Sequence, residues 1–159
     1  MKFIVDVMLG RLAKLLRMLG HDTVYFSQGD DLKLLKIARE QKRVLLTRRS
    51  ALRVNKGSQE LLFVTDDNSW NQLRQVIHEL KLTPSDRSIF TVCLVCNERL
   101  IAIAKEVAAE VVPEYILNTY DSFYMCPNCK RIYWPGTHHN RMLRNMVYLR
   151  DSEDINPQK

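Results

Sequence analysis

The sequence of 159 residues has no hydrophobic run that approaches the roughly 20 residues needed to cross a bilayer, which argues against a membrane-spanning helix. Its start has neither the basic segment nor the small-residue cleavage site of an export signal. It has no internal repeat and no low-complexity tract, and 46% of its residues are hydrophobic, so a mostly disordered chain is excluded. We expect one globular domain, or one with a small addition, in the reducing cytoplasm.

Several common functional motifs are absent as well. No G-x-G-x-x-G follows the first apolar run, which argues against dinucleotide binding, and no G-x-x-x-x-G-K-[ST] indicates a P-loop. No Ser or Cys stands in a recognisable nucleophile turn. A phosphoacceptor receiver domain needs an aspartate after its third strand, where this chain has arginines.

The positive charge is concentrated in the first half of the chain. The net charge is +6, and residues 1–83 hold 15 Lys and Arg against 9 Asp and Glu, whereas residues 84–159 hold 9 of each. A basic module favours a polyanionic partner such as nucleic acid. A solvated basic surface is the alternative that charge alone does not exclude.

Short apolar strands alternate with amphipathic helices in the first half. The pattern predicts strands at 2–7, 22–26, 43–47 and 60–65, helices at 8–19 and 31–42, one or two helical turns within 48–56, and a helix that a capping box opens at Ser69 and Gln72. Such alternation predicts an α/β fold, with a parallel sheet and helices on both faces. The pattern breaks at residues 82–86, so we expect an α/β domain at 1–83, a second module at 84–150 and a polar tail at 151–159.

The second module contains all four cysteines, arranged as two C-x2-C pairs. The pairs are Cys93/Cys96 and Cys126/Cys129. Each pair can place two thiolates on one turn, and two turns supply the four soft ligands of a tetrahedral zinc site. We expect a closed structural Zn2+ site in a small ribbon that depends on the metal to fold. Two disulfides or four unrelated thiols are the alternative.

The remaining elements expected in this module are short. Strands are predicted at 90–95, 101–103, 123–125 and 131–134, a helix at 105–111 and a terminal helix at 138–150.

Acidic residues follow three of the predicted strands of the first half. They are Asp6, the pair Asp30 and Asp31, and the pair Asp66 and Asp67. In open α/β sheets, ligands bind beyond the carboxyl ends of the strands, and converging carboxylates suit Mg2+ or Mn2+. Helix capping is the alternative for Asp31 and Asp67, and also for Asp6, which interrupts an apolar strand.

The order of these segments resembles a known family. FIVDVMLGRLAKLLRMLGHDTVYF at 3–26, DDLKLLKIARE at 30–40, VLLTR at 44–48, both C-x2-C pairs and YWPGTHHNRM at 133–142 resemble the RNase domain found at the C-terminus of the Mut-seven exonuclease family. The resemblance spans roughly residues 2–146. It implies a PIN-like three-layer α/β/α nuclease fold with a parallel sheet and a C-terminal zinc ribbon.

Carried over by this resemblance, Asp6 is the first catalytic acid and the Asp30-Asp31 pair the second, and the four cysteines are the zinc ligands. The family continues its third strand as LLTRD, whereas this chain has Arg49 in place of the final aspartate. A guanidinium at that point should weaken Mg2+ binding, because it repels the ion. Asp66 or Asp67 could compensate from the fourth strand.

Contacts with RNA are expected from both modules. The basic residues that we expect to contact the RNA backbone are Arg11, Lys14, Arg48, His138 and Arg141. Trp134 could stack on a base, or it could pack the ribbon against the α/β domain.

Three functions are consistent with these residues. The first is a metal-dependent endoribonuclease in which Asp6, Asp30, Asp31 and Asp66 hold Mg2+ or Mn2+. The second is an RNA-binding protein whose nuclease activity is weakened or lost because of Arg49. The third is a zinc-ribbon module that binds a protein partner, with the acids serving only as caps.

Overall fold

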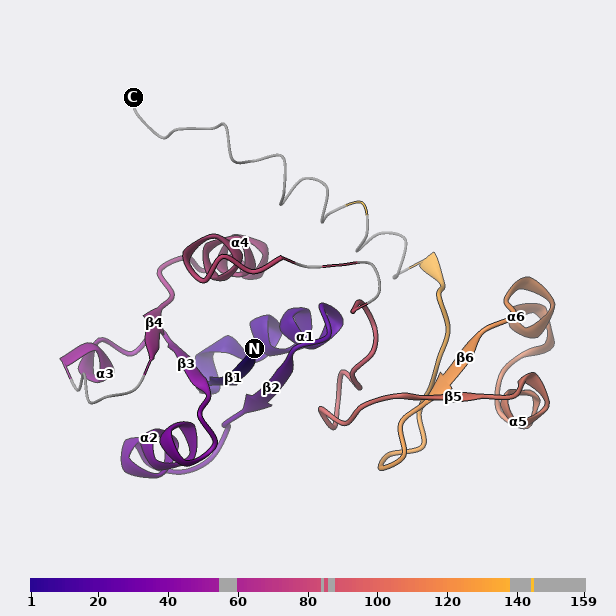
Figure 1. Ribbon diagram of the computed structural model, residues 1–159, viewed down its shortest axis with the longest axis horizontal. Coiled ribbons are helices and arrows are strands. Elements are labelled where there is room, and N and C mark those ends of the chain that lie inside the picture. Colours follow the sequence, from indigo (N-terminus) through magenta and orange to yellow (C-terminus); the bar gives the residue numbers. More distant parts are fainter. Residues whose placement is uncertain (55–59, 84, 86–87, 138–143, 145–159) are drawn as a thin grey trace. The chain divides into compact units, whose positions relative to one another are not determined.

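The computed structural model describes residues 1–54, 60–83, 85, 88–137 and 144. Contacts between Cα atoms divide the chain into two units, Met1–Asn97 and Glu98–Lys159 (Figure 1). With this division the first cysteine pair belongs to the N-terminal unit. None of the helices that the structure describes is long and apolar enough to cross a membrane.

The N-terminal unit is built on a parallel four-stranded sheet. Its strands are β1 (Lys2–Val5), β2 (Asp22–Tyr25), β3 (Val44–Thr47) and β4 (Leu61–Phe63), in the order β2-β1-β3-β4. Val5 lies opposite both Tyr25 and Leu46, and Thr47 lies opposite Phe63. The strands therefore end together at one edge of the sheet, as the sequence predicted.

Helices cover both faces of this sheet. They are the 3-10 helix η1 (Val7–Leu9), α1 (Gly10–Met18), α2 (Asp31–Glu40), α3 (Ser50–Val54) and α4 (Ser69–Glu79). α1 packs against α4, and Figure 1 shows α4 and α2 on opposite sides of the strands. Leu34 and Ala38 of α2 pack with Ile4 and Leu45 of the sheet and Leu52 of α3. The result is the predicted three-layer α/β/α fold.

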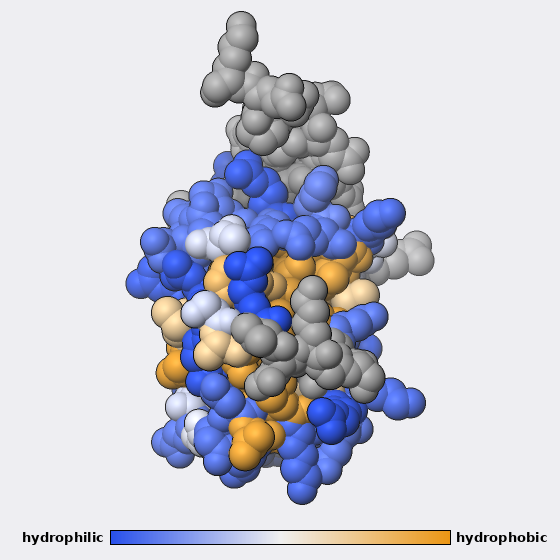
Figure 2. Space-filling view, turned by 90° about the vertical axis from the view of Figure 1, so that its left-hand side faces the viewer, coloured by the Kyte–Doolittle hydropathy of each residue, from blue (hydrophilic) through white to orange (hydrophobic). Residues whose placement is uncertain are grey.

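The outer surface agrees with this layering. Figure 2 views the molecule from the side on which α3 lies in Figure 1, and hydrophobic residues cross the middle of the view between hydrophilic residues above and below. All four residues of β3 are buried, because a parallel sheet covered on both faces leaves no side for water.

The start of α4 differs from the sequence prediction. Asn68, not Ser69, caps α4, and its side chain accepts hydrogen bonds from the amides of Trp70 and Asn71 at 2.9 and 3.4 Å. The predicted capping box is therefore wrong, and the Gln72 side chain instead donates to the carbonyl of Asp66 at 2.8 Å. The segment Asp66-Asp67-Asn68-Ser69 offers four competent caps in a row, so the pattern did not determine which one is used.

The first cysteine pair lies on a turn that packs against α1 and β2 within the same unit. The strand predicted at 90–95 is wrong, because residues 94–96 form a turn that brings both cysteines to one side. Gly20, after α1, allows the segment that precedes the cysteine turn to approach closely at Ser88. It has a φ of +85°, and a Cβ there would lie 2.0 Å from the Ser88 carbonyl oxygen.

The C-terminal unit contains the antiparallel sheet β5-β6-β7 and two short helices. Its elements are β5 (Ile101–Ile103), α5 (Lys105–Ala109), α6 (Glu114–Thr119), β6 (Phe123–Met125) and β7 (Ile132–Tyr133). α6 was not predicted from the sequence. Pro113 closely follows the helix predicted at 105–111, and it is also the residue that precedes the first turn of α6.

Trp134 packs within this C-terminal unit, against a core formed by Ala108, Val112 and Phe123. Of the two expectations for Trp134, packing is thus observed, but against the core of its own unit. The terminal helix predicted at 138–150 and the tail from 151 lie outside the described residues, apart from residue 144.

His21 is a half-buried histidine that follows α1. Its ring contacts the Phe3 ring edge to face, with centroids 5.4 Å apart. Its Nε2 atom has no hydrogen-bond partner among the residues that the structure describes. Burial, and then the charge of the N-terminal amine, lowers the pKa of His21 from 6.5 to about 4. The folded protein therefore resists a proton that the unfolded chain accepts.

Acid is expected to weaken the fold through His21. Because the pKa of His21 is lowered in the folded state, neutral His21 contributes to the free energy of unfolding above pH 6.5. This contribution is lost as the pH falls from 6.5 towards about 4. In urea unfolding, the free energy of unfolding of the wild type should fall between pH 7 and pH 5. In His21→Gln this fall should be smaller by about 1 kcal/mol, a value already reduced for solvent screening. His78→Gln, at an exposed histidine of α4, is the matched control. Equal pH dependence in the His21 and His78 variants would contradict the prediction.

Candidate functional site

Asp6 is a fully buried carboxylate at the end of β1. Its Oδ1 accepts a hydrogen bond from the Met8 amide at 2.8 Å, which caps η1. Its Oδ2 accepts from the Thr47 hydroxyl and from the Arg48 amide at 3.3 Å. Asp6 is thus both a helix cap and a strand-end acid, and the chain itself holds it in place.

Arg49 lies between two of the candidate catalytic acids. Its guanidinium forms an ion pair with Asp31, and its Nε lies 3.6 Å from Oδ2 of Asp6. The Arg49 amide donates to the Thr47 hydroxyl at 3.0 Å, which fixes the start of this side chain. The side chain is 30% exposed. A single cation supplied by the chain therefore bridges the carboxylates of Asp6 and Asp31.

The neighbouring Arg48 is also paired. Its guanidinium contacts Asp67, whose side chain is 89% exposed, in an ion pair at the surface. The two consecutive arginines after β3 thus neutralise three acids. These are Asp6 after β1, Asp31 at the start of α2 and Asp67 after β4.

Asp30 and Asp66 are used locally. Asp30 caps α2 and accepts from the Lys33 amide at 2.8 Å. Asp66 accepts from the Asn68 amide at 2.6 Å and from the Asn71 side chain at 3.0 Å. The hydrogen bond from the Asn68 amide is the main cause that holds the pKa of Asp66 below its ordinary value. The caps predicted at Asp31 and Asp67 are thus supplied by their preceding or following neighbours, Asp30 and Asn68.

The acidic edge of the sheet does not fit a divalent cation in this arrangement. Among the described residues, the only group of three or more ligand-type side chains close enough to hold one ion is the cysteine group. Asp6 and Asp31 are joined through a guanidinium, whose charge repels Mg2+. The structure does not gather Asp6, Asp30, Asp31 and Asp66 around a common point.

The four cysteines form the second candidate site. The sulfur atoms of Cys93, Cys96, Cys126 and Cys129 all lie within 4.8 Å of one another. In each pair the second amide points at the first sulfur, with N–S distances of 3.3 Å for Cys96 to Cys93 and 3.5 Å for Cys129 to Cys126. Zn–S bonds of about 2.3 Å place tetrahedral sulfurs about 3.8 Å apart, so the group could hold one Zn2+.

Arg17 supports the first cysteine turn, a role that the sequence analysis missed. Its side chain is buried and donates to the carbonyls of Thr23, Leu94 and Val95 at 2.9, 2.8 and 3.1 Å. At helical spacing, Arg17 falls on the same side of α1 as the exposed residues Arg11 and Lys14, away from its apolar residues. Only the fold shows that this face is covered by the cysteine turn, so no signal in the sequence alone could have identified it.

The structure describes three of the five basic residues that we expected to contact RNA. Arg11 and Lys14 are exposed on α1, and Arg48 is engaged with Asp67. His138 and Arg141 lie outside the described residues.

The parallel sheet with its helices and the cysteine group define an α/β protein with a candidate zinc site. The family model of the Mut7-C RNAse domain matches residues 1–146. The chain therefore belongs to the Mut7-C RNAse domain family, as the resemblance predicted, and this membership indicates a nuclease-like function. No curated protein and no solved structure matches the chain.

Proposed function

We propose that this chain is an RNA-binding member of its family in which metal-dependent cleavage is weakened or lost. The observation that carries the proposal is the Arg49 guanidinium between Asp6 and Asp31. A guanidinium neutralises the carboxylates that a metal ion would otherwise need as ligands, and it supplies neither a bound water nor an open coordination position.

Electrostatics favours the arginine over an added ion. Two unit charges 4 Å apart interact by about 4 kcal/mol at an effective dielectric constant of about 20, and a divalent ion doubles that repulsion. Mg2+ would therefore enter only if the Arg49 side chain left both carboxylates. The Asp6 carboxylate accepts hydrogen bonds from three donors of the chain, so it does not require an ion for its own stability.

The family membership and the basic surface support RNA as the partner. Arg11 and Lys14 are exposed, and neither forms an ion pair with another described residue. Such cations attract phosphate without first having to break a contact within the protein.

A metal-dependent ribonuclease is the second candidate. Asp6 and Asp31 are both retained, and the Arg49 side chain is partly exposed. An RNA phosphate that binds the guanidinium would compete with these carboxylates and release them. Asp6, Asp30, Asp31 and Asp66 would then be the acids available to Mg2+ or Mn2+.

Replacing Arg49 with aspartate is expected to create or raise metal-dependent cleavage. The measurement is the cleavage of labelled single-stranded and structured RNA with Mg2+, Mn2+ or EDTA. We expect the wild type to bind RNA with strong salt dependence but to cleave it no faster than the EDTA background. Arg49→Asp should cleave at least about 100-fold faster, the scale of a single electrostatic group in an active site. Arg49→Gln is the matched control, because it removes the cation without adding an acid.

The same assay separates the alternatives. Cleavage by the wild type that requires Mg2+ or Mn2+ and is lost in Asp6→Asn would establish the second candidate in place of the proposal. Failure of the wild type to bind RNA at low salt would contradict both and leave a zinc-ribbon module that binds protein.

A further inference from the structure

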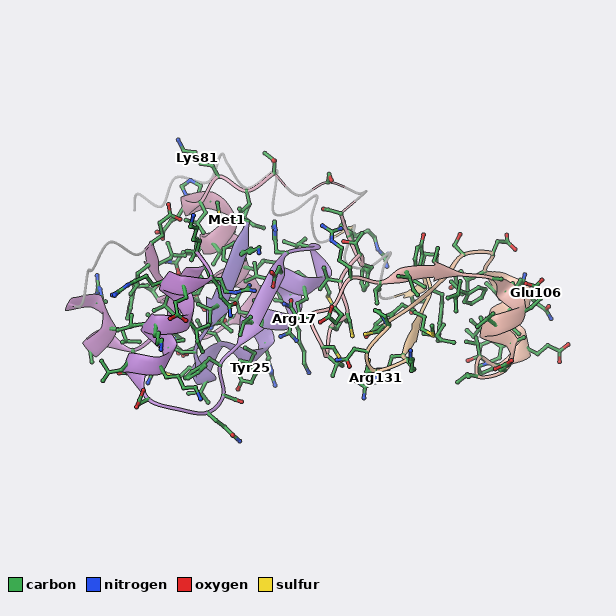
Figure 3. The ribbon with its side chains drawn as sticks, turned by 60° about the horizontal axis from the view of Figure 1, so that its bottom comes forward. Met1, Arg17, Tyr25, Lys81, Glu106 and Arg131 are labelled. Atoms are coloured by element: carbon green, nitrogen blue, oxygen red, sulfur yellow. The ribbon has the colours of Figure 1, made fainter. Side chains whose placement is uncertain are left out.

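A pocket of about 460 Å³ opens on the N-terminal unit beside η1 and the first turns of α1. The residues of its lining that bear on recognition are Val7, Met8, Arg11, Lys14, Tyr25 and Gln72. Its volume lies within the usual range of small-molecule sites, about 300–1,000 Å³. Arg17 lines the pocket as well, and it is labelled in Figure 3 together with Tyr25. The pocket therefore has the size for one nucleotide unit.

One side of the pocket is cationic. Arg11 and Lys14 are three residues apart on α1, so they project from the same side of the helix, and both are exposed. The first turn of α1 contains no acidic residue. The acid in the lining, Asp67, is paired with Arg48. The two exposed cations are therefore available for an anion such as phosphate.

The other side is apolar and aromatic. Tyr25 is 38% exposed, and Val7 and Met8 are 53% and 55% exposed. The Tyr25 hydroxyl donates to the Val7 carbonyl at 3.1 Å, which fixes the ring. The ring also lies so close to Gly10 that a Cβ there would come within 3.2 Å of it. A rigid, half-exposed aromatic ring beside two cations matches a base next to its phosphate.

We propose that this pocket binds one nucleotide of single-stranded RNA, with the base against Tyr25 and the phosphate at Arg11 and Lys14. The inference rests on the proposed RNA binding and adds to it a defined subsite. Val7 and Met8 directly follow Asp6 in the chain, so a strand held here passes the end of β1, where Arg49 and the acids lie.

An acidic peptide or a free phosphate would use the cations but would not need the aromatic ring. A nucleotide engages both sides, and the exposed apolar surface of Val7, Met8 and Tyr25 gives the base a place away from water. The contribution of the ring therefore distinguishes RNA from other anions.

The test measures binding of a fluorescent eight-residue oligouridylate, and of an abasic oligomer of the same length, by anisotropy with the full chain loaded with zinc. Arg11→Gln/Lys14→Gln should weaken both probes at least about tenfold and should make the slope of log K against log salt shallower by about 1.4, as expected for two lost phosphate contacts. Lys36→Gln/Arg39→Gln on α2 removes the same types of charge from exposed positions and is the matched control.

The ring is tested separately. Tyr25→Leu should weaken binding of oligouridylate at least about fivefold, the lower limit for loss of a base stacked on an aromatic ring, and should leave the abasic probe within about twofold. Tyr25→Phe removes only the hydroxyl and should keep most of the affinity, which assigns a loss in Tyr25→Leu to the ring. Unchanged binding of the abasic probe by Tyr25→Leu shows that this variant is still folded.

Two results would overturn the inference while leaving RNA binding intact. One is an equal loss in the α1 and α2 double variants, and the other is a loss in Tyr25→Leu that is the same for both probes. Absence of binding by the wild type would instead overturn the proposed function itself.

Discussion

Serine at any one of the four cysteine positions is expected to weaken zinc binding about 100-fold and to destabilise the C-terminal ribbon. The sulfurs lie within 4.8 Å of one another, as in a site with four equivalent ligands. Structural zinc contributes about 10–16 kcal/mol to the folding of zinc-finger peptides, so one ligand of four corresponds to about 3 kcal/mol, or about 100-fold in affinity. Elemental analysis should find one Zn2+ per wild-type chain, and amide exchange should show loss of protection in β5, β6 and β7 of each variant.

Asn128→Ala provides the matched control for this prediction. Asn128 is exposed between Cys126 and Cys129, and it lies outside the group of ligand-type side chains. Its replacement should leave zinc content unchanged. Wild-type protein with much less than one Zn2+ per chain, or cysteine variants whose zinc affinity in competition with a chelator equals that of the wild type, would contradict a four-cysteine site.

Replacement of Arg17 by methionine is expected to cost about 3 kcal/mol of unfolding free energy. The methionine side chain keeps most of the packing but leaves the carbonyls of Thr23, Leu94 and Val95 without their shared donor. Each buried acceptor that loses its partner costs about 1–3 kcal/mol, and neighbouring losses are not additive. Urea unfolding of the zinc-loaded protein is the measurement.

The position of Arg17 also predicts a faster loss of metal. Two of its acceptors are the residues between Cys93 and Cys96, so the variant should release zinc faster to a chelator than the wild type. Arg11→Met, on the same helix but exposed, should change stability by less than about 0.5 kcal/mol. Equal stabilities of the Arg17 and Arg11 variants would show that the three carbonyls do not depend on this donor.

The sequence predicted the sheet well because its strands carry a strong signal. The runs that became β1 and β3 are apolar on both faces, and only a strand covered by helices needs that composition. The cysteine spacing was equally informative, since two C-x2-C pairs in one short module are typical of a zinc site. Local choices were less certain. Which of several neighbouring residues caps α4, or whether Pro113 ends one helix or begins another, depends on competing contacts of similar energy.

The contacts that define the candidate site depend on residues far apart in the chain. The sequence and its family resemblance identified Arg49 as a departure from the expected acid. They did not show that the guanidinium reaches both Asp6 and Asp31, because that depends on the position of α2 beside β3. Likewise, Arg17 has the helical spacing of a solvated residue, and its carbonyl partners lie as many as 78 residues away.

The pairing of Arg49 with Asp6 and Asp31 has a consequence for how the fold depends on ion supply. Neighbouring carboxylates usually need a counter-ion from solution, so their stability follows the concentration of that ion. Here the counter-ion is the Arg49 guanidinium, which is covalently part of the chain. Its effective concentration near the acids is set by the Arg49 backbone, whose amide is held by the Thr47 hydroxyl. The edge of the sheet therefore stays neutralised in a chelating or magnesium-poor solution.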